Sequence, residues 1–346
     1  MKQYKTIDLF KFICAILIIV LHASPFASYS KILTFGFRNI ITVIAVPFFF
    51  AASGFLTFSK LNTITDEADR KKYIWKYAKR IIQMYLIWSA IYFVFVVYKW
   101  IKNSFSYMNV LLYIRNFFFE GSYSTIWFLP ALLTATVFEY LLSKRFQKKT
   151  IILIAVPFYL FGLLGSTYFG IAEKIPFLND IFGVYYTCLK SVKNGLLFGF
   201  VFVALGAYIA ERQDNLKITP MKCLAGFTAG MILLAVESFT INMLDINDKG
   251  CDLVLSLIPT TIFMLLLALK WQPGGSDKMY LVFRKYSLLM FLVQRIPISI
   301  IELFLNDTVL MTNSIVNFTV IFGVTMLLSF VIIKLSDRFK FLKRLY

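Results

Sequence analysis

The stretch IDLFKFICAILIIVLHASPF, residues 7–26, decides the fold class of this protein. It is long and apolar enough to cross a bilayer as one helix, since about 20 such residues span the hydrocarbon core. Asp8, Lys11 and His22 interrupt it, and His22 is the only histidine of the chain. A signal peptide also places basic residues before an apolar run. The three interruptions and the apolar segments that follow favour a retained membrane helix.

The same pattern recurs along the 346 residues, of which 59% are hydrophobic, and the mean hydropathy is +0.75. No period-two alternation, the mark of membrane barrels, is evident. We predict an all-α integral membrane protein with about ten transmembrane helices and a single domain, residues 1–346. The predicted segments are 7–26, 38–58, 76–98, 125–142, 150–165, 191–210, 219–242, 252–270, 281–304 and 314–335. Tyr107–Phe119 is amphipathic and is expected at the membrane interface.

The net charge of +18 gathers in alternate loops. Such loops mark the cytoplasmic side, so both termini are predicted to be cytoplasmic. The loop NDTVLMTN, 306–313, carries no basic residue and is predicted to lie outside. Because this pattern explains the charge, and no soluble basic domain exists, nucleic acid is excluded as a partner. The clusters are Lys60, Arg70, Lys71 and Lys72; Lys144, Arg145, Lys148 and Lys149; Arg212 and Lys217; Lys278 and Arg284; Lys334, Arg338, Lys340, Lys343 and Arg344.

Lys11 and His22 lie eleven positions apart, which is about three helical turns and about 16 Å, so they share one face. Cys14 and Ala15 lie between them and leave room beside the helix. Asp8, three residues before Lys11, can pair with it. Two simpler interpretations stay open: Lys11 as a snorkelling anchor and His22 as a hydrogen-bonded packing residue. Metal binding is not expected, because the histidine is alone and the four cysteines form no CxxC.

The third segment begins with a basic face in KYAKRIIQMYL, 76–86. Lys76, Lys79, Arg80 and Gln83 recur there at three- and four-residue spacing. Such a face at the cytoplasmic entrance suits phosphates. The alternative is an ordinary anchor that contacts lipid phosphates.

Polar residues of other segments are candidates because an ionisable group in a membrane helix is costly. Glu237 lies deep in an apolar run and is expected to be neutral or paired with a basic residue. In VPFFFAASGF, 46–55, Pro47 breaks the helix, and Ser53 and Gly54 allow a close backbone approach.

Three further candidates lie at predicted outer helix ends. Trp127 is a belt residue or a substrate contact. Lys193 and Asn194 lie at the outer mouth of the sixth segment. The long outer loop 166–190 is either a lid or a packed cap.

Taken in order, these motifs resemble the membrane acyltransferase-3 family. Asp8–x–x–Lys11–x10–His22 matches a pattern in which Arg usually stands at Lys11. VPFFFAASGF resembles FF-x-x-SG, and KYAKRIIQMYL is similar to the basic third helix. TIWFLPALL resembles H-L-W-F-x-P-A-L with Thr125 at the histidine; KNGLLFGF resembles R-N-G-x-F-F with Lys193 at the arginine. MFLVQRIPI resembles I-Y-L-I-H-P with Gln294 at the histidine. The chain looks most similar to the membrane domain of vancomycin-resistance serine racemases, without the racemase domain.

The resemblance implies an O-acetyltransferase of the bacterial plasma membrane. Its co-substrate would be acetyl-CoA, with no tightly bound cofactor, and its acceptor a hydroxyl of a cell-surface glycan, peptidoglycan or a similar molecule. The predicted catalytic residues are His22, as the family histidine and general base, and Glu237. The predicted coenzyme contacts are Lys11, Lys76, Lys79, Arg80 and Gln83. The predicted acceptor contacts are Asp8, Ser53, Trp127, Lys193 and Asn194.

Two other function classes stay open. The likeness to serine racemases also suits an amino-acid or proton-coupled transporter, in which Pro47 breaks a helix and His22 and Glu237 carry protons. A non-catalytic membrane partner would tolerate substitution of Lys11 and His22.

Overall fold

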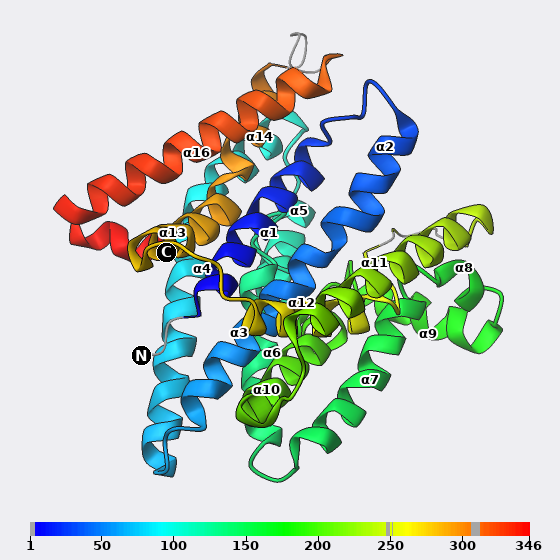
Figure 1. Ribbon diagram of the computed structural model, residues 1–346. Coiled ribbons are helices and arrows are strands. Elements are labelled where there is room, and N and C mark those ends of the chain that lie inside the picture. The colour runs from blue at the N-terminus through cyan, green and yellow to red at the C-terminus, as the bar shows by residue number, and fades with distance from the viewer. Residues whose placement is uncertain (1–3, 247–249, 251, 306–311) are drawn as a thin grey trace.

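The computed structural model describes residues 4–246, 250, 252–305 and 312–346, and every regular element in these ranges is helical (Figure 1). Seven helical segments within them are long and apolar enough to cross a membrane. They are Lys5–Ala23 (α1), Lys31–Leu61 (α2 to α3), Glu67–Lys102 (α4), Gly195–Asn215 (with α10), Pro220–Met243 (α11), Asp277–Phe304 (α13 and α14) and Ser314–Arg338 (α16). The predicted all-α membrane fold is therefore confirmed in kind.

Three other predicted segments hold shorter helices: α6 (Phe128–Leu142), α7 (Lys148–Leu164) and α12 (Leu257–Lys270). The count of ten spans and the side of the termini stay predictions, and most of the loop 306–313 lies outside the described residues. The remaining elements are α2 (Lys31–Gly36), η1 (Phe37–Ile41), η2 (Thr42–Ile44), α3 (Ala45–Leu61), α5 (Tyr107–Phe119), α8 (Phe169–Ala172), α9 (Pro176–Cys188), η3 (Gly195–Gly199), α10 (Phe200–Arg212), η4 (Gln213–Asn215), α13 (Asp277–Val293), α14 (Arg295–Phe304) and η5 (Lys340–Leu345).

Prolines break two of the spans. A π turn (η1) and a 3-10 turn (η2) precede Pro47, which lacks the N–H that would bond to the carbonyl of Val43. Pro297 acts in the same way between α13 and α14, and the break falls at Gln294. The Tyr92 hydroxyl bonds the Leu292 carbonyl at 2.5 Å, next to this break. Residues 281–304, which were predicted as one segment, therefore form parts of two helices.

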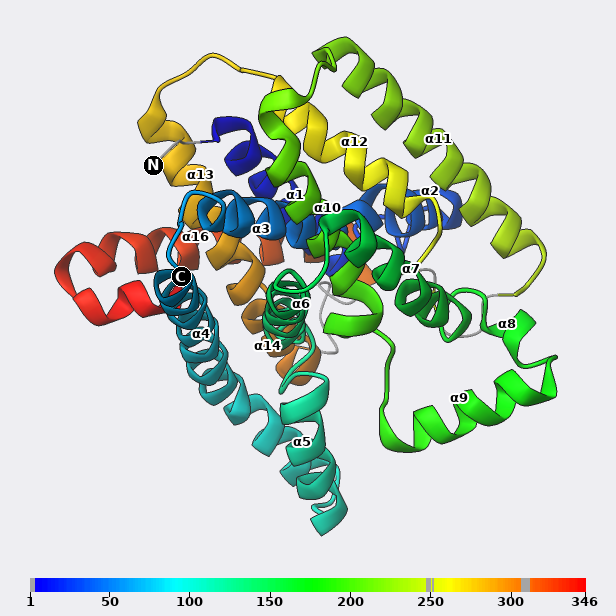
Figure 2. The ribbon, with the colours of Figure 1, turned by 90° about the horizontal axis from the view of Figure 1, so that it is seen from below.

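Helix α1 lies at the centre of the bundle, between α13 and α3 (Figures 1 and 2). The most apolar stretch of α10 is 78% buried, against 17% for α16 and 22% for α11. Because α16 and α11 lie on opposite sides of the bundle (Figure 2), they offer apolar surface to lipid there. The central helices therefore position the buried polar residues.

Small residues let α3 and α10 cross closely. A Cβ on Gly54 would overlap the backbone of Val203, and a Cβ on Gly206 would overlap the carbonyl of Ala51. The close approach predicted at Gly54 is confirmed, and its partner is α10.

The 166–190 loop folds into α8 and α9, which pack on a small core of Phe169, Ala172 and Phe182. The Tyr185 hydroxyl bonds the Ser191 carbonyl at 3.0 Å and fixes the end of α9. Of the two alternatives for this loop, a lid or a packed cap, the packed cap agrees with this arrangement.

Candidate functional site

A cavity of about 80 Å³ lies beside His22, near the C-terminal end of α1. We call it the His22 cavity. It is lined by Ile18, Leu21, His22, Thr42, Val43, Val46, Thr125, Trp127, Lys193, Phe198, Asp252 and Phe291. In the part of the chain that the structure describes, no hydrogen bond to the imidazole of His22 is formed.

Three predicted site residues from distant segments meet in this cavity: His22, Trp127 and Lys193. The Trp127 ring stacks on Phe198, with ring centroids 6.0 Å apart. Lys193 forms an ion pair with Asp252. The cavity therefore combines one imidazole, one compensated charge pair and an aromatic wall.

Asp252 and Thr125 were not predicted as site residues. Asp252 is the first residue of the eighth predicted segment. An acidic residue at a predicted outer helix end, where Lys193 also lies, was the sequence feature that could have indicated it. Thr125 is 3% exposed, and its hydroxyl has no partner among the described residues. A buried hydroxyl without a partner is costly, so an unused donor at the cavity wall favours a ligand contact.

Glu237 does not line the His22 cavity, and its carboxylate binds protein groups. It accepts from the backbone N–H of Leu255 at 2.7 Å and of Ser256 at 2.8 Å, and from the Tyr168 hydroxyl. These bonds hold the start of α12 to α11. Among the described residues, the partners of Glu237 are backbone N–H groups and Tyr168 rather than a base, because the unsatisfied N–H groups at a helix start attract a carboxylate. A catalytic role for Glu237 stays a prediction.

Asn194 has a local structural role as well. Its side-chain oxygen accepts from the N–H of Leu196 and Leu197, and its amide donates to the Tyr185 hydroxyl at 3.0 Å. It therefore caps the helix that starts at Gly195. Ser53 is half-buried on α3 and does not line the cavity.

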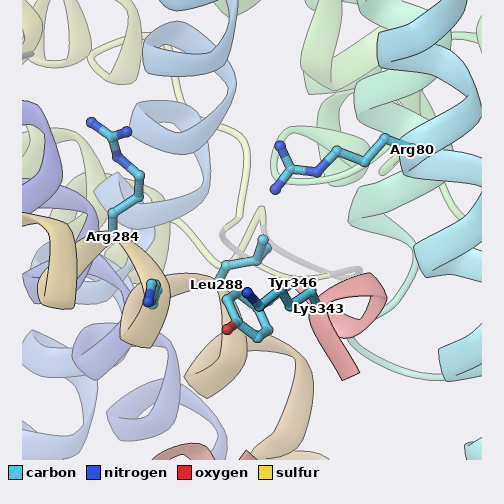
Figure 3. A pocket seen from close by; sticks show the side chains of 6 residues that line it. Arg80, Arg284, Leu288, Lys343 and Tyr346 are labelled. Carbon is cyan, nitrogen blue, oxygen red and sulfur yellow. The ribbon is translucent and has the colours of Figure 1, made fainter. Parts of the chain in front are cut away.

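A second, larger pocket of about 440 Å³ lies near the N-terminal end of α1 (Figure 3). We call it the basic pocket. It is lined by Arg80, Arg284, Lys285, Leu288, Lys343 and Tyr346. Figure 3 shows Arg80 extending into it from α4, across from the α13 residues Arg284 and Leu288. Of the predicted basic face, Arg80 is the residue that the pocket uses; Lys76, Lys79 and Gln83 are exposed on α4 nearby.

Asp8 binds Arg284 through two parallel hydrogen bonds of 2.9 and 2.8 Å. The side chain of Asp8 is 3% exposed and that of Arg284 is 50% exposed. The structure therefore gives Asp8 a partner other than Lys11, because a guanidinium matches a carboxylate with two donors at once. Lys11 is half-buried on α1 and does not line the basic pocket.

The two sites share α1 and α13. On α1, Asp8 binds Arg284 of the basic pocket, and Ile18 lines the His22 cavity. On α13, Leu288 lines the basic pocket, and Phe291 lines the His22 cavity. Leu288 and Phe291 differ by about 4.5 Å of helical rise. Between the sites, Cys14 and Ala15 are fully buried. The stripe that was expected to leave room is thus packed in this conformation.

Comparison with known proteins adds a second line of observation. The profile described as an acyltransferase domain, that of the acyltransferase-3 family, matches residues 4–334. The chain belongs to the acyltransferase-3 family. The predicted resemblance is confirmed, and acyltransferase activity at a membrane is its general expectation.

Curated relatives of this family member include two amino-acid racemases of Enterococcus faecalis. One is 29% identical over 77% of this chain, and the other is 26% identical over 98%. A serine/alanine racemase of Enterococcus gallinarum is 23% identical over 93% of the chain. The matches cover 36%, 47% and 45% of those proteins, so the chain spans less than half the length of these relatives. No solved structure matches this acyltransferase-3 chain.

Proposed function

We propose that this protein is a transmembrane O-acyltransferase of the bacterial plasma membrane. It would move an acyl group, usually acetyl, from cytoplasmic acyl-CoA to a hydroxyl of a cell-surface glycan, peptidoglycan or a related acceptor. The observation that carries this proposal is the placement of a basic pocket and the His22 cavity near opposite ends of α1. With cytoplasmic termini, the basic pocket faces the donor and His22 faces the acceptor.

The basic pocket is the donor site in this proposal. Guanidinium and ammonium groups bind phosphate oxygens well, and Arg80 enters the pocket. Lys11 lies about one helical turn beyond Asp8, whose carboxylate binds Arg284 of the pocket. The exposed Lys76, Lys79 and Gln83 widen the basic face that attracts the coenzyme.

The coenzyme arm has the length to join the sites. Extended pantetheine measures roughly 15–20 Å by ordinary covalent geometry, and Lys11 and His22 are separated by about 16 Å of helix. Because Cys14 and Ala15 are buried, the arm would pass only when the packing around these two residues loosens.

The His22 cavity would carry out the transfer. His22 removes the proton from the acceptor hydroxyl, and that oxygen attacks the thioester carbonyl carbon. The Thr125 hydroxyl and Lys193 stabilise the negative oxygen that forms. The carbon–sulfur bond then breaks, and His22 returns the proton to the thiolate, which leaves an ester and free coenzyme A. A transient acyl-histidine is a variant of this scheme.

The test is His22→Ala in membranes that hold the full chain. We expect transfer of labelled acetyl from acetyl-CoA to envelope material to be lost, while the amount of folded protein and its elution profile stay unchanged. Thr34→Ala is the matched control, because among the described residues that hydroxyl bonds only the carbonyl of Ser30, the N-cap of α2, at 2.8 Å. Acetyl transfer that persists in His22→Ala would refute the proposal.

The contacts of Glu237 support the transporter alternative less well than the enzyme. Glu237 has both carboxylate oxygens engaged by backbone N–H groups and Tyr168, as bonds that hold α12 in place. A carrier must release and rebind its proton, which would cost these bonds.

A further inference from the structure

The segment that follows α16 lies against the basic pocket. It consists of Lys340–Leu345 (η5) and Tyr346, and we call it the 340–346 segment. Lys343 and Tyr346 from this segment line the pocket (Figure 3). Sequence patterns assigned Lys343 only to the positive-inside charge. We propose that the 340–346 segment forms part of the donor site and binds the phosphorylated adenosine end of the coenzyme.

The segment is held in place by two bonds to buried groups. The indole N–H of Trp88, 1% exposed, donates to the Leu345 carbonyl at 3.0 Å. The Ser336 hydroxyl, on the last turn of α16, lies 2.7 Å from the Tyr346 hydroxyl. The segment is therefore fixed to α4 and α16, the first of which also carries Arg80.

The charge of the pocket selects an anion with several negative groups. It holds four cations, Arg80, Arg284, Lys285 and Lys343. Only Arg284 has a salt bridge to a carboxylate among the residues that the structure describes, and that partner is Asp8. The other three form no salt bridge among the described residues, so a ligand with a single phosphate would compensate only part of the positive charge of the pocket.

The pocket also offers an apolar surface and enough space. Tyr346 supplies a ring and Leu288 an aliphatic side chain beside the cations. Its 440 Å³ falls within the range of small-molecule sites, about 300–1,000 Å³. A planar base joined to a 5′-diphosphate and a 3′-phosphate matches this combination of charge and aromatic wall. The inference rests on the proposed function, because it names the residues that hold the same donor.

The experiment measures binding of coenzyme A and of adenosine 3′,5′-bisphosphate to the full chain in nanodiscs of neutral phosphatidylcholine, by calorimetry. Lys343→Ala should weaken both affinities about tenfold, as expected when one charge-assisted contact is lost. Tyr346→Phe keeps the ring and should bind within about threefold of the wild type, whereas Tyr346→Ala should lose about tenfold.

Arg344→Ala is the matched control. Arg344 carries the same charge, adjoins Lys343 and does not line the pocket, so its removal should change affinity less than about twofold. Equal effects of Lys343→Ala and Arg344→Ala would overturn the inference while coenzyme binding by the wild type upholds the proposed donor. A wild-type chain that binds neither nucleotide would overturn both.

A phosphate of an anionic lipid offers related chemistry, so a second arm uses nanodiscs that contain phosphatidylglycerol. Native mass spectrometry then counts the lipid that each variant retains. Coenzyme A that displaces retained phosphatidylglycerol supports a nucleotide site. Phosphatidylglycerol that stays bound in the wild type at saturating coenzyme A, and is lost in Lys343→Ala, would make the pocket a lipid site and refute the inference.

Discussion

The ion pair of Asp8 and Arg284 gives an asymmetric prediction about stability. The side chain of Asp8 is 3% exposed and that of Arg284 is 50% exposed. Arg284→Gln leaves a buried carboxylate without its partner, which costs about 3–5 kcal/mol of unfolding free energy. Lys11 lies three residues further along α1 and can shift toward the carboxylate, so we expect the lower end of this range.

Asp8→Asn removes the buried charge instead and leaves the half-exposed guanidinium. Water replaces the lost bonds on the exposed side, so the expected cost falls to about 1–2 kcal/mol. In the double variant Asp8→Asn with Arg284→Gln no charge is stranded, and we expect it to be more stable than Arg284→Gln alone.

Reversible unfolding in mixed detergent micelles, followed by circular dichroism, measures the three free energies. Control variants at Lys5 and Asp277, an exposed ion pair of 2.7 Å, should each cost less than about 1 kcal/mol. If Asp8→Asn costs as much as Arg284→Gln, or more, the reasoning from unequal exposure is refuted.

Three further variants test other parts of the structure. Glu237→Gln should lower the free energy of unfolding by about 1–3 kcal/mol, because it weakens the bonds at the start of α12. Turnover per folded molecule should stay within about twofold of the wild type. A hundredfold loss of turnover at normal stability would instead support a catalytic role for Glu237. Gly206→Ala should cost about 1–3 kcal/mol by overpacking against the Ala51 carbonyl, whereas Gly36→Ala, with open space around its Cβ, should not destabilise the protein in the same denaturation assay. Thr125→Val should lower kcat about 10–100-fold in the acetyl-transfer assay without loss of stability. Thr325→Val also removes a buried hydroxyl that has no partner among the described residues, and it should leave kcat unchanged.

Much of the site was predictable because helical phase is a local property. Lys11 and His22 share one face through the repeat of 3.6 residues, and the motifs around Trp127 and Lys193 pointed to the same outer end. The structure brings His22, Trp127 and Lys193 into one cavity. The catalytic role of His22 and the acceptor contacts of Trp127 and Lys193 stay predictions.

The partners of the charged groups were not predictable. Asp8 has Lys11 as a neighbour in the sequence but binds Arg284, 276 positions away. Glu237 was predicted to be catalytic, and in the structure its carboxylate accepts from the backbone N–H of Ser256, just before α12. Both outcomes depend on which helices pack together, and spacing along one helix carries no such information.

The sequence by itself determined the membrane-helix class, most helix positions and the acyltransferase-3 family, because hydropathy, prolines and caps act within a few residues of the chain. Only the tertiary structure decided that Arg284 and Lys343, two residues of the positive-inside pattern, share a pocket with Arg80. The same holds for Asp252 beside Lys193. Each of these groups comes from a different helix or loop, and long-range packing, which fixes their distances, has no local signature.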